Sequence, residues 1–366
     1  PVFVIRRRIK KEKITYDQLP SLLQKTAVLF ESRKIKIADK ILFWGTNCPE
    51  YSILLLSCFS FGRTAIPIDY RNSETTVKSI IEITKPKVAF VSKYFRYQFL
   101  EDLGLKIYFI EDLFKDFNIK LKFKIDKRFS GPENLSEIVF TSGTTGKPKG
   151  VMIKQKNLYS NIELMQKSIP DLADSSTISV LPLSHMLEQI VGLLVPITEG
   201  TTIYYLPKIN SFRLLLALQE YKPTHLVVVP QLLKIIWNKV EEKAASEGKL
   251  NQLHKLLETC QYLPNPVKKI IFAKIHRIFG GNLRFVACGG APLDINVGKN
   301  WMRAGIPVIE GYGATEVTAV ATMNILGKIK LGSAGKPIDQ VQIKIGEDKE
   351  IIIAGPSLSS GYFNDP

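Results

Sequence analysis

The chain has 366 residues, of which 45% are hydrophobic and 10% aromatic, and this composition excludes a disordered protein. The length is more than one compact core needs and predicts two or three packed units. The formal net charge of +16 would suit a nucleic-acid-binding protein, but the lysines and arginines are spread along the whole chain without a basic-aromatic cluster or a binding motif. We therefore expect no nucleic acid partner.

The sequence also limits membrane and metal chemistry. Its apolar stretches are far shorter than the roughly 20 residues that a membrane span needs, and no secretory signal peptide is visible. The four cysteines and four histidines are dispersed without metal-ligand spacing, so we expect reduced thiols in a cytoplasmic protein and no zinc site. The basic run 6–13 predicts a solvated face, and the alternative is a weak peripheral contact with an anionic membrane.

In chain order, the first half alternates short apolar runs with segments whose apolar residues recur at helical spacing. A short strand pair is expected at 10–13 and 14–16, followed by a helix over 19–33. Helices are also predicted from about 46 to 60 and over 73–84, the last one capped by Ser73. The predicted strands are 40–44, 65–68, 88–91, 106–110 and 138–140.

The second half continues this alternation and ends in a different pattern. Residues 244–278 are expected to be helical throughout, with a break near 263–266. From 328 onward, short strands at 342–345 and 350–353 are separated by glycine and proline turns. The other predicted strands are 151–153, 177–181, 201–206, 225–229, 283–287 and 308–309, and the other predicted helices are 155–168, 211–221, 230–241 and 294–304.

Strands that alternate with helices predict an α/β protein with two doubly wound, largely parallel sheets packed together. The last part predicts a small antiparallel or barrel-like unit. We expect one large domain of three parts: a first α/β subdomain over about 1–175, a second over 176–325, and the start of a small β subdomain over 326–366.

Residues 141–150, TSGTTGKPKG, follow an apolar strand and consist almost entirely of threonine, serine, glycine and lysine. Glycines allow a ligand to approach the backbone closely, while hydroxyl and ammonium groups can replace the water contacts of charged oxygens. The pattern predicts a polyphosphate-binding loop, with a mobile surface loop as the alternative. It is not a Walker A loop, because only two residues separate Gly143 from Gly146 and Pro148 follows Lys147.

Three further loops with unusual residues follow predicted strands. They are 182–188 (PLSHMLE), 288–292 (CGGAP) and 310–316 (EGYGATE). Ligands of open parallel sheets bind beyond the carboxyl ends of the strands. The shared position of these loops and of 141–150 therefore predicts one composite site.

Two of these loops contain side chains suited to a nucleotide or a carboxylate. The ring of Tyr312, flanked by Gly311 and Gly313, could stack on a purine, and Glu316 offers a hard oxygen ligand for magnesium. A core tyrosine beside an ordinary turn is the alternative. His185 is a candidate for positioning a reacting group, and a hydrogen-bonded core histidine is the alternative to that role.

The run 140–150 resembles the signature phosphate loop of the AMP-forming adenylate-forming enzymes, the superfamily of acyl-CoA synthetases, luciferases and nonribosomal adenylation domains. The segment YGATE (312–316) resembles the second signature of that superfamily, and PLSHMLE (182–188) resembles its acyl-side motif. The segment FGRTAIPID (61–69) also resembles a family segment, and we interpret it as core packing. The resemblance extends from about residue 14 to the last residue.

The resemblance implies a role for each site residue. Thr141 and Glu316 would bind magnesium, Thr315 would contact the α-phosphate of ATP, and His185 would position the carboxylate beside it. The β- and γ-phosphates would be held by Ser142, Gly143, Thr144, Thr145, Gly146 and Lys149. The adenine would be framed by Gly289, Gly290, Ala291, Glu310, Gly311, Tyr312 and Gly313. The expected catalytic residues are His185, Lys149, Thr315 and Glu316.

The implied reaction joins a carboxylate to ATP, giving an acyl-adenylate and pyrophosphate, and then usually transfers the acyl group to coenzyme A. Residues 244–278 together with LRFVACGGAPLD (283–294) are more similar to long-chain fatty-acid–CoA ligases than to amino-acid adenylation domains. We therefore expect a medium- or long-chain fatty acid as the substrate. The alternatives are an acyl-acyl-carrier-protein synthetase and a non-catalytic nucleotide- or acyl-binding module.

Members of this family continue beyond the segment that the last residues, GYFNDP (361–366), resemble. In them a hinge follows, and then a small mobile domain that carries a further lysine. The resemblance therefore implies an N-terminal large domain without the mobile C-terminal domain. We expect it to bind ATP and to make little thioester by itself.

Overall fold

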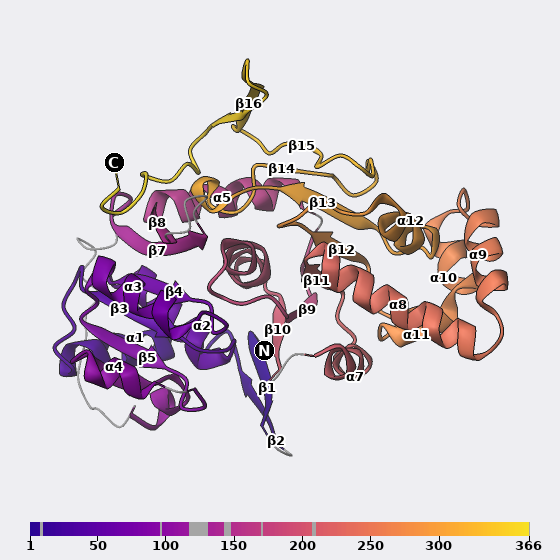
Figure 1. The fold of residues 1–366 in the computed structure, drawn as a ribbon. Coiled ribbons are helices and arrows are strands. Elements are labelled where there is room, and N and C mark those ends of the chain that lie inside the picture. The colour runs from indigo at the N-terminus through magenta and orange to yellow at the C-terminus, as the bar shows by residue number, and fades with distance from the viewer. Residues whose placement is uncertain are drawn as a thin grey trace.

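The computed structural model describes residues 1–7, 10–95, 97–116, 131–142, 148–169, 171–206 and 210–365 (Figure 1). These parts of the chain form four sheets flanked by helices, so the predicted α/β class is confirmed. None of the helices described is long and apolar enough to cross a bilayer. The central part of the predicted phosphate loop, 143–147, lies outside the described residues.

The first half of the chain builds a six-stranded sheet in the order β6-β5-β3-β4-β7-β8. Neighbouring strands are parallel, except for the antiparallel pair β7 and β8. Ser73 caps α3 as predicted, because its hydroxyl accepts a hydrogen bond from the N–H of Thr76 (3.2 Å). The strands are β3 (Lys40–Trp44), β4 (Thr64–Ile68), β5 (Val88–Val91), β6 (Lys106–Phe109), β7 (Leu135–Ser142) and β8 (Pro148–Lys154), and the helices are α1 (Leu19–Ser32), α2 (Pro49–Ser60), α3 (Glu74–Thr84), α4 (Gln98–Asp102) and the 3₁₀ helix Ile110–Asp116.

Two further sheets lie edge to edge; the second half of the chain builds one of them and contributes two strands to the other. One has the order β2-β1-β10-β9 and the other the order β11-β12-β13-β14-β15. The N–H of Thr224 donates to the carbonyl of Ser176 (2.8 Å) and links the two sheets beside β9 and β11. The strands are β1 (Phe3–Arg7), β2 (Lys10–Ile14), β9 (Ser176–Ser179), β10 (Thr202–Tyr205), β11 (His225–Val228), β12 (Phe285–Cys288), β13 (Val308–Tyr312), β14 (Thr322–Met323) and β15 (Lys336–Pro337).

The predicted strand pair at 10–13 and 14–16 is wrong. The partner of β2 is β1, in which Phe3 lies opposite Ile14, and β1 in turn pairs in parallel with β10, opposite Ile203. Residues 3–14 thus belong to a sheet whose other two strands, β9 and β10, come from the second half of the chain, although the expected boundary near 175 placed residues 3–14 in the first subdomain. That boundary stays a prediction.

Helices cover the second-half sheets and form one end of the molecule. The stretch 244–278 is broken more often than predicted. The first break lies at Gly248 (φ 69°), and another separates α10 from α11 at Phe272. The helices are α5 (Gln155–Ser168), the π-helix Glu188–Leu194, α6 (Val195–Thr198), α7 (Ser211–Tyr221), α8 (Pro230–Ser246), α9 (Leu250–Thr259), α10 (Asn265–Ile271), α11 (Ala273–Ile278), α12 (Ile295–Arg303) and the 3₁₀ helix Thr315–Val317.

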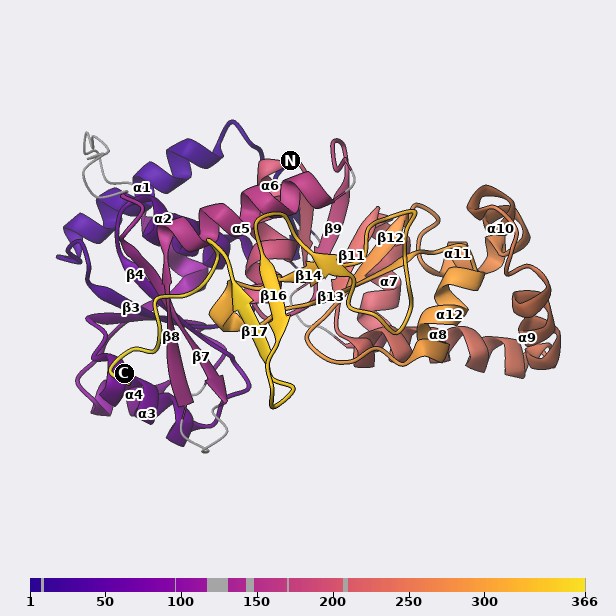
Figure 2. The ribbon, with the colours of Figure 1, turned by 90° about the horizontal axis from the view of Figure 1, so that it is seen from above.

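The last part of the chain is antiparallel, as predicted. Strands β16 (Gln342–Ile345) and β17 (Ile351–Ala354) form a hairpin that lies above the other sheets in Figure 1 and crosses them in Figure 2. The chain then returns to β8, where the carbonyl of Gly361 accepts from Met152 and the N–H of Phe363 donates to Gly150 (2.9 and 2.7 Å). The final residues thus lie beside the strand that follows the predicted phosphate loop.

One apolar core joins the two halves of the chain. It contains Phe43 and Val139 from the six-stranded sheet, Phe3 and Ile203 from β1 and β10, and Ile190 from the π-helix, all of them buried. A separate core at the helical end contains aromatic rings in contact from α8, α12 and the residue after α11. The shared core fixes the carboxyl ends of both sets of strands relative to each other, and the candidate site lies there.

Candidate active site

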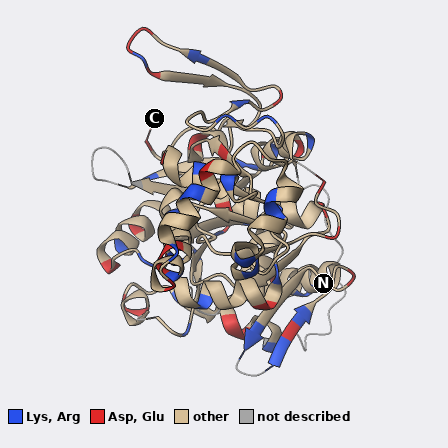
Figure 3. Ribbon diagram, turned by 90° about the vertical axis from the view of Figure 1, so that its right-hand side faces the viewer, with Lys and Arg blue, Asp and Glu red and all other residues tan. Residues whose placement is uncertain are grey.

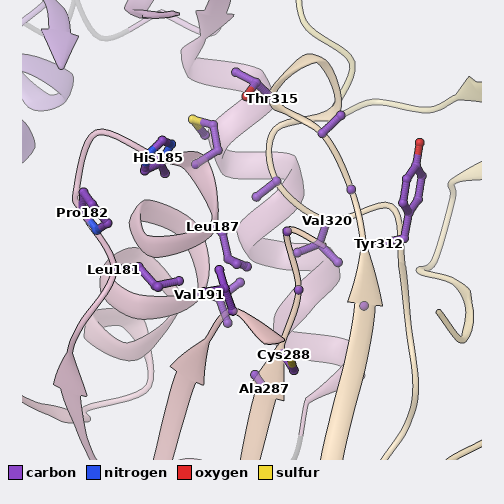
Figure 4. A pocket seen from close by; sticks show the side chains of 18 of the residues that line it. Leu181, Pro182, His185, Leu187, Val191, Ala287, Cys288, Tyr312, Thr315 and Val320 are labelled. Carbon is purple, nitrogen blue, oxygen red and sulfur yellow. The ribbon is translucent and has the colours of Figure 1, made fainter. Parts of the chain in front are cut away.

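A cavity of about 610 Å³ opens where the carboxyl ends of β9, β11, β12 and β13 meet the π-helix (Figure 4). Three of the four predicted strand-end loops line it, through Pro182 and 185–187, through 288–290 and through 311–315. In Figure 4, His185 and Thr315 lie towards one end of the cavity, and aliphatic side chains lie towards the strands. The composite site predicted for these three loops is therefore present.

The glycines of two loops allow backbone segments to meet at this cavity. A Cβ on Gly313 would lie only 1.6 Å from the carbonyl oxygen of Ala319, so this position accepts no side chain. Gly290 has φ 81°, in the left-handed region that favours glycine. The cavity is lined by four residues of the predicted adenine frame, Gly289, Gly290, Gly311 and Tyr312, and their contact with an adenine stays a prediction.

Glu310 and Ala291 of the predicted adenine frame lie outside the cavity lining. Glu310 is buried, and its Oε1 accepts a hydrogen bond from the N–H of Leu293 (3.3 Å). Burial raises the pKa of this carboxyl, and the hydrogen bond from Leu293 opposes that shift. Glu310 thus fastens the loop that follows β12 to β13.

The side chain of His185 lies between two cavities and lines both of them. It lines the main cavity and also a smaller one of about 350 Å³, which Thr141 and Pro148 line on the side of the six-stranded sheet. Its Nε2 lies 2.9 Å from Oδ2 of Asp69, which also lines the smaller cavity. The predicted site role of His185 has a structural basis here, because the alternative of a histidine enclosed in the core does not fit a half-exposed side chain.

Asp69 is a site residue that the sequence reasoning missed. The segment 61–69 was expected to pack in the core, which is correct for Ile66 and Ile68 and wrong for Asp69. The Arg71 guanidinium forks onto the same carboxylate, with Nη2 at 2.6 Å from Oδ2. Burial acts to raise the pKa of Asp69, but the hydrogen bonds with His185 and Arg71 outweigh it and hold the pKa below its ordinary value. The sequence feature that could have indicated Asp69 is a charged residue directly after a buried strand.

The loop that carries His185 is tied down by Asn47, a buried residue that precedes α2. Its Nδ2 donates to the carbonyl of Leu181 (2.6 Å) and its Oδ1 accepts from the N–H of Leu183 (2.9 Å), so one amide holds the backbone on both sides of Pro182. Three well-formed hydrogen bonds from one buried side chain, the third to Ser179, leave the loop little freedom.

Beneath this loop the chain forms a π-helix, a conformation that occurs mostly at functional sites. Its first residue, Glu188, is buried and accepts a hydrogen bond from the hydroxyl of Ser179 (2.5 Å). Burial raises the pKa of Glu188 to about 8, although the hydrogen bond from Ser179 opposes the shift. A Cβ on Gly192 would lie 2.6 Å from Cδ of Glu188, so a side chain at position 192 would displace this carboxyl.

The last residues of the chain lie near three of the predicted site residues, which are Thr141, Lys149 and Glu316. Thr141 and Lys149 are direct cross-strand partners in β7 and β8. The ammonium of Lys149 lies 3.2 Å from Oδ2 of Asp365 and 5.0 Å from the ring centre of Tyr362. The hydroxyl of Tyr362 donates to Oε1 of Glu316 (2.8 Å). Two of the expected phosphate and metal residues therefore contact the same tyrosine.

Thr141 and Glu316 fit a magnesium ion by their chemistry. Both offer hard oxygen ligands, and a site with a single carboxylate suits an ion that keeps several waters and binds substrate phosphates. Within the described residues, no group of three or more His, Cys, Asp or Glu side chains could hold a metal by itself. The metal role of these two residues stays a prediction.

The central residues of the predicted phosphate loop are not among the residues that the structure describes. Gly143, Thr144, Thr145 and Gly146 lie outside the described residues, and Ser142 is described only as the last residue of β7. Pro148 begins the strand β8, in agreement with the expectation that no helix starts at this loop.

Several side chains of the basic run 6–13 form ion pairs with carboxylates. Arg6 and Lys11 both pair with Glu220 (3.0 and 2.8 Å), and Arg7 pairs with the buried Glu50 (2.6 Å). These side chains hold the β1–β2 hairpin against α2 and α7. The peripheral membrane contact suggested for this run stays a prediction.

Comparison with known proteins agrees with the resemblance. The long-chain-fatty-acid–CoA ligase FadD15 of Mycobacterium bovis is 22% identical over 405 residues, which cover 100% of this chain and 66% of that protein. The long-chain-fatty-acid–CoA ligase 5 of Mus musculus is 29% identical, covering 87% of this chain and 54% of that protein. This chain thus spans between about half and two thirds of the length of these relatives.

Solved structures share the fold. The N-terminal domain of FACL13 from Mycobacterium tuberculosis has a TM-score of 0.79 at 18% identity, covering 100% of this chain and 88% of that chain. The o-succinylbenzoate coenzyme A synthetase MenE from Bacillus subtilis, in complex with AMP, has a TM-score of 0.76 at 20% identity, covering 99% and 86%. The family model described as AMP-binding enzyme matches residues 2–363. The chain therefore belongs to the AMP-binding enzyme family.

Proposed function

We propose that this chain activates a medium- or long-chain fatty acid with ATP. The carboxylate attacks the α-phosphorus, the bond to the β-phosphate oxygen breaks, and the products are an acyl-adenylate and pyrophosphate. The acyl group then passes to the thiol of coenzyme A, with release of AMP. Membership of the AMP-binding enzyme family and the names of the long-chain-fatty-acid–CoA ligases it resembles support this assignment.

The observation that carries the proposal is the position of His185 between two cavities of different character. On one side lies the large cavity, in which Leu187, Val191 and Val320 are among the aliphatic lining residues. On the other side lies the small cavity with Thr141, at the end of the strand that leads into the predicted phosphate loop. A molecule with an apolar tail and a polyphosphate would have its reacting centre at the junction.

The proposed reaction needs no covalent enzyme intermediate, so positioning and charge stabilisation supply the catalysis. Asp69 accepts a hydrogen bond from Nε2 of His185 and so fixes the ring orientation, which leaves Nδ1 for contacts with the reactants. Lys149 would balance negative charge on the departing pyrophosphate. Thr315, which lines the large cavity, offers its hydroxyl to the α-phosphate.

Magnesium, held by Thr141 and Glu316 together with phosphate oxygens, would neutralise phosphate charge as the leaving group departs. Glu316 is already oriented by the hydroxyl of Tyr362, which occupies one of its carboxylate oxygens. An oriented carboxylate loses less freedom when it binds an ion, so this contact favours the proposed role.

The lining of the large cavity favours a fatty acid over an amino acid. None of the described residues that line it is acidic, whereas an amino-acid substrate would need a counter-ion for its ammonium group. Its polar side chains include His185 and Arg71, which suit a carboxylate or a phosphate instead. Ligand pockets that take apolar molecules share this composition of mainly aliphatic walls with few polar groups.

ATP–pyrophosphate exchange tests the proposal without requiring the thioester step. We expect exchange with fatty acids of about eight to eighteen carbons, at least ten times faster than with amino acids or with aromatic acids, and almost none with the His185→Ala variant. A preference for aromatic acids would change the proposed substrate from a fatty acid to an aromatic acid, which the likeness to MenE allows. ATP binding without exchange for any acid would indicate a binding module. Offering coenzyme A and an acyl carrier protein in parallel distinguishes the two acceptors.

A further inference from the structure

A third cavity, of about 540 Å³, lies between helices α8, α9 and α11, and we call it the helical groove. Its floor is apolar and contains the buried side chains Val240, Phe272 and Ile275. It shares no lining residue with the large cavity of the candidate active site. Figure 1 shows α8, α9 and α11 at the end of the molecule opposite the six-stranded sheet, and Figure 3 views the molecule from that end.

The rim of the helical groove is positively charged. Lys243, Lys249, Lys274 and Arg277 line it, and Glu247 is the only acidic residue among its described lining. Lys249 binds this carboxylate (3.2 Å). The hydrogen bond from Lys249, followed by the charges of Lys249, Lys274 and Lys243, lowers the pKa of Glu247, so the cations converge on one place.

Three of the four cations are available to a ligand. Within the described residues, Lys243, Lys274 and Arg277 make no ion pair, and all three side chains are exposed. Two apolar side chains of the groove, Leu256 and Ile271, are also open to water, at 40% and 39% exposure. Among the described residues, these three cations therefore have no counter-ion, and the apolar surface of Leu256 and Ile271 stays in contact with water.

We propose that the helical groove binds a single-chain amphipathic anion from solution. Its hydrocarbon chain would lie on the apolar floor and cover Leu256 and Ile271, while its anionic head would contact Lys243 and Arg277. A purely apolar ligand would leave the cations unpaired, and a small anion such as phosphate would leave the floor in water. The volume lies within the range of small-molecule sites. A concave site enclosed by three helices suits one chain rather than the surface of a bilayer.

Titration calorimetry with dodecanoate, below its micelle concentration, tests this site. The large cavity is first saturated with a non-hydrolysable acyl-adenylate analogue, whose own binding is measured in the same experiment. We expect one dodecanoate per chain to bind in the presence of the analogue. Dodecyltrimethylammonium, which has the same tail and the opposite charge, should bind at least ten times more weakly.

Paired variants assign the binding to the groove. We expect Lys243→Glu combined with Arg277→Glu to weaken dodecanoate binding at least tenfold, and Leu256→Gln combined with Ile271→Gln to do the same. These positions are exposed, so the fold should tolerate the changes. The matched control reverses two exposed lysines that line neither cavity, Lys234 on α8 and Lys299 on α12, and should change the affinity less than twofold.

Several results would overturn the proposal. They are no dodecanoate bound beside the analogue, equal binding of the cationic detergent, or unchanged affinity in both groove variants. Binding only to vesicles of anionic lipid, and not to monomeric dodecanoate, would make the region a membrane-facing surface instead. If the adenylate analogue itself failed to bind, the proposed function would be rejected, and the groove variants would still decide the second site.

Discussion

At the residue scale, Asp69 sets the position of His185. It lies directly after β4 with a mostly buried side chain, and it accepts from both His185 and Arg71. A carboxylate with two cationic or polar donors stays ionised over a wide pH range, in keeping with its lowered pKa. The imidazole is therefore held at a fixed angle at the junction of the two cavities.

We predict that Asp69→Asn lowers kcat for ATP–pyrophosphate exchange by about 10- to 100-fold while the affinity for ATP changes little. The reason is that a misplaced reacting group costs rate even where binding is retained. Steady-state kinetics with separate kcat and KM values measure this. The control is Asp102→Asn, at an exposed residue that ends α4. Unchanged kcat in the Asp69 variant would show that His185 needs no such support.

Gly313 shows how close two backbone segments come at the site. We predict that Gly313→Ala lowers the free energy of unfolding by about 2–3 kcal/mol, since its Cβ would overlap the carbonyl of Ala319. Denaturant midpoints measure the change. Gly131→Ala is the matched control, because nothing lies closer than 4.0 Å to a Cβ there, and its effect should stay within about 0.5 kcal/mol. A tolerated alanine at 313 would mean that the two segments can separate.

At the element scale, the segment after β17 occupies the groups proposed to bind phosphate. It pairs with β8, its Asp365 binds Lys149, and its Tyr362 binds Glu316. A polyphosphate and Asp365 would compete for the same ammonium. The end of this segment therefore acts on nucleotide affinity.

We predict that Asp365→Asn tightens the binding of a non-hydrolysable ATP analogue with magnesium by about two- to fivefold. The gain is small because both side chains of this pair are partly exposed, and such pairs contribute about 1 kcal/mol or less. Calorimetric titration measures it. Glu133→Gln removes the same charge from the lysines at the far end of β8 and should leave the affinity unchanged. Weaker binding in the Asp365 variant would contradict the competition.

At the scale of the whole molecule, a shared apolar core makes the two halves depend on each other. Glu137 of β7 lies inside that interface with no exposed surface, beside the side chain of Gln189 in the π-helix. Burial raises the pKa of Glu137 from its ordinary 4.5 to about 8. The carboxyl is therefore neutral in the folded protein at neutral pH.

This burial makes stability fall as the pH rises. Between about pH 4.5 and 8 the folded chain keeps the proton on Glu137 and the unfolded chain releases it, so the free energy of unfolding decreases across that window. We predict that Glu137→Gln is at least about 1 kcal/mol more stable than the parent chain at pH 8.5 and about equal to it at pH 5. Thermal unfolding at both pH values measures this, with Glu101→Gln, at an exposed position on α4, as the control. A parallel decline in both variants would place the pH dependence elsewhere.

Much of the fold and part of the site followed from local patterns. The alternation of buried strands and amphipathic helices predicted β3 to β5 and α1 to α3 to within three residues, because side-chain burial repeats at short range along the chain. The unusual residues at strand ends predicted that 182–188, 288–292 and 310–316 would meet, since parallel strands place their carboxyl ends at one edge.

Other features depend on partners that are far away in the sequence. The strand β1 was missed because its neighbours are a hairpin arm and β10, about two hundred residues later, and no local pattern records that pairing. The role of Asp69 arises only when β4 ends beside the loop of His185, and the contact of Lys149 with Asp365 arises only when the chain end returns to β8. The sequence by itself determined most of the strands and helices and which loops are polar, because those depend on near neighbours. Only the tertiary structure decided which charges face each other, because an electrostatic partner is chosen by distance in space.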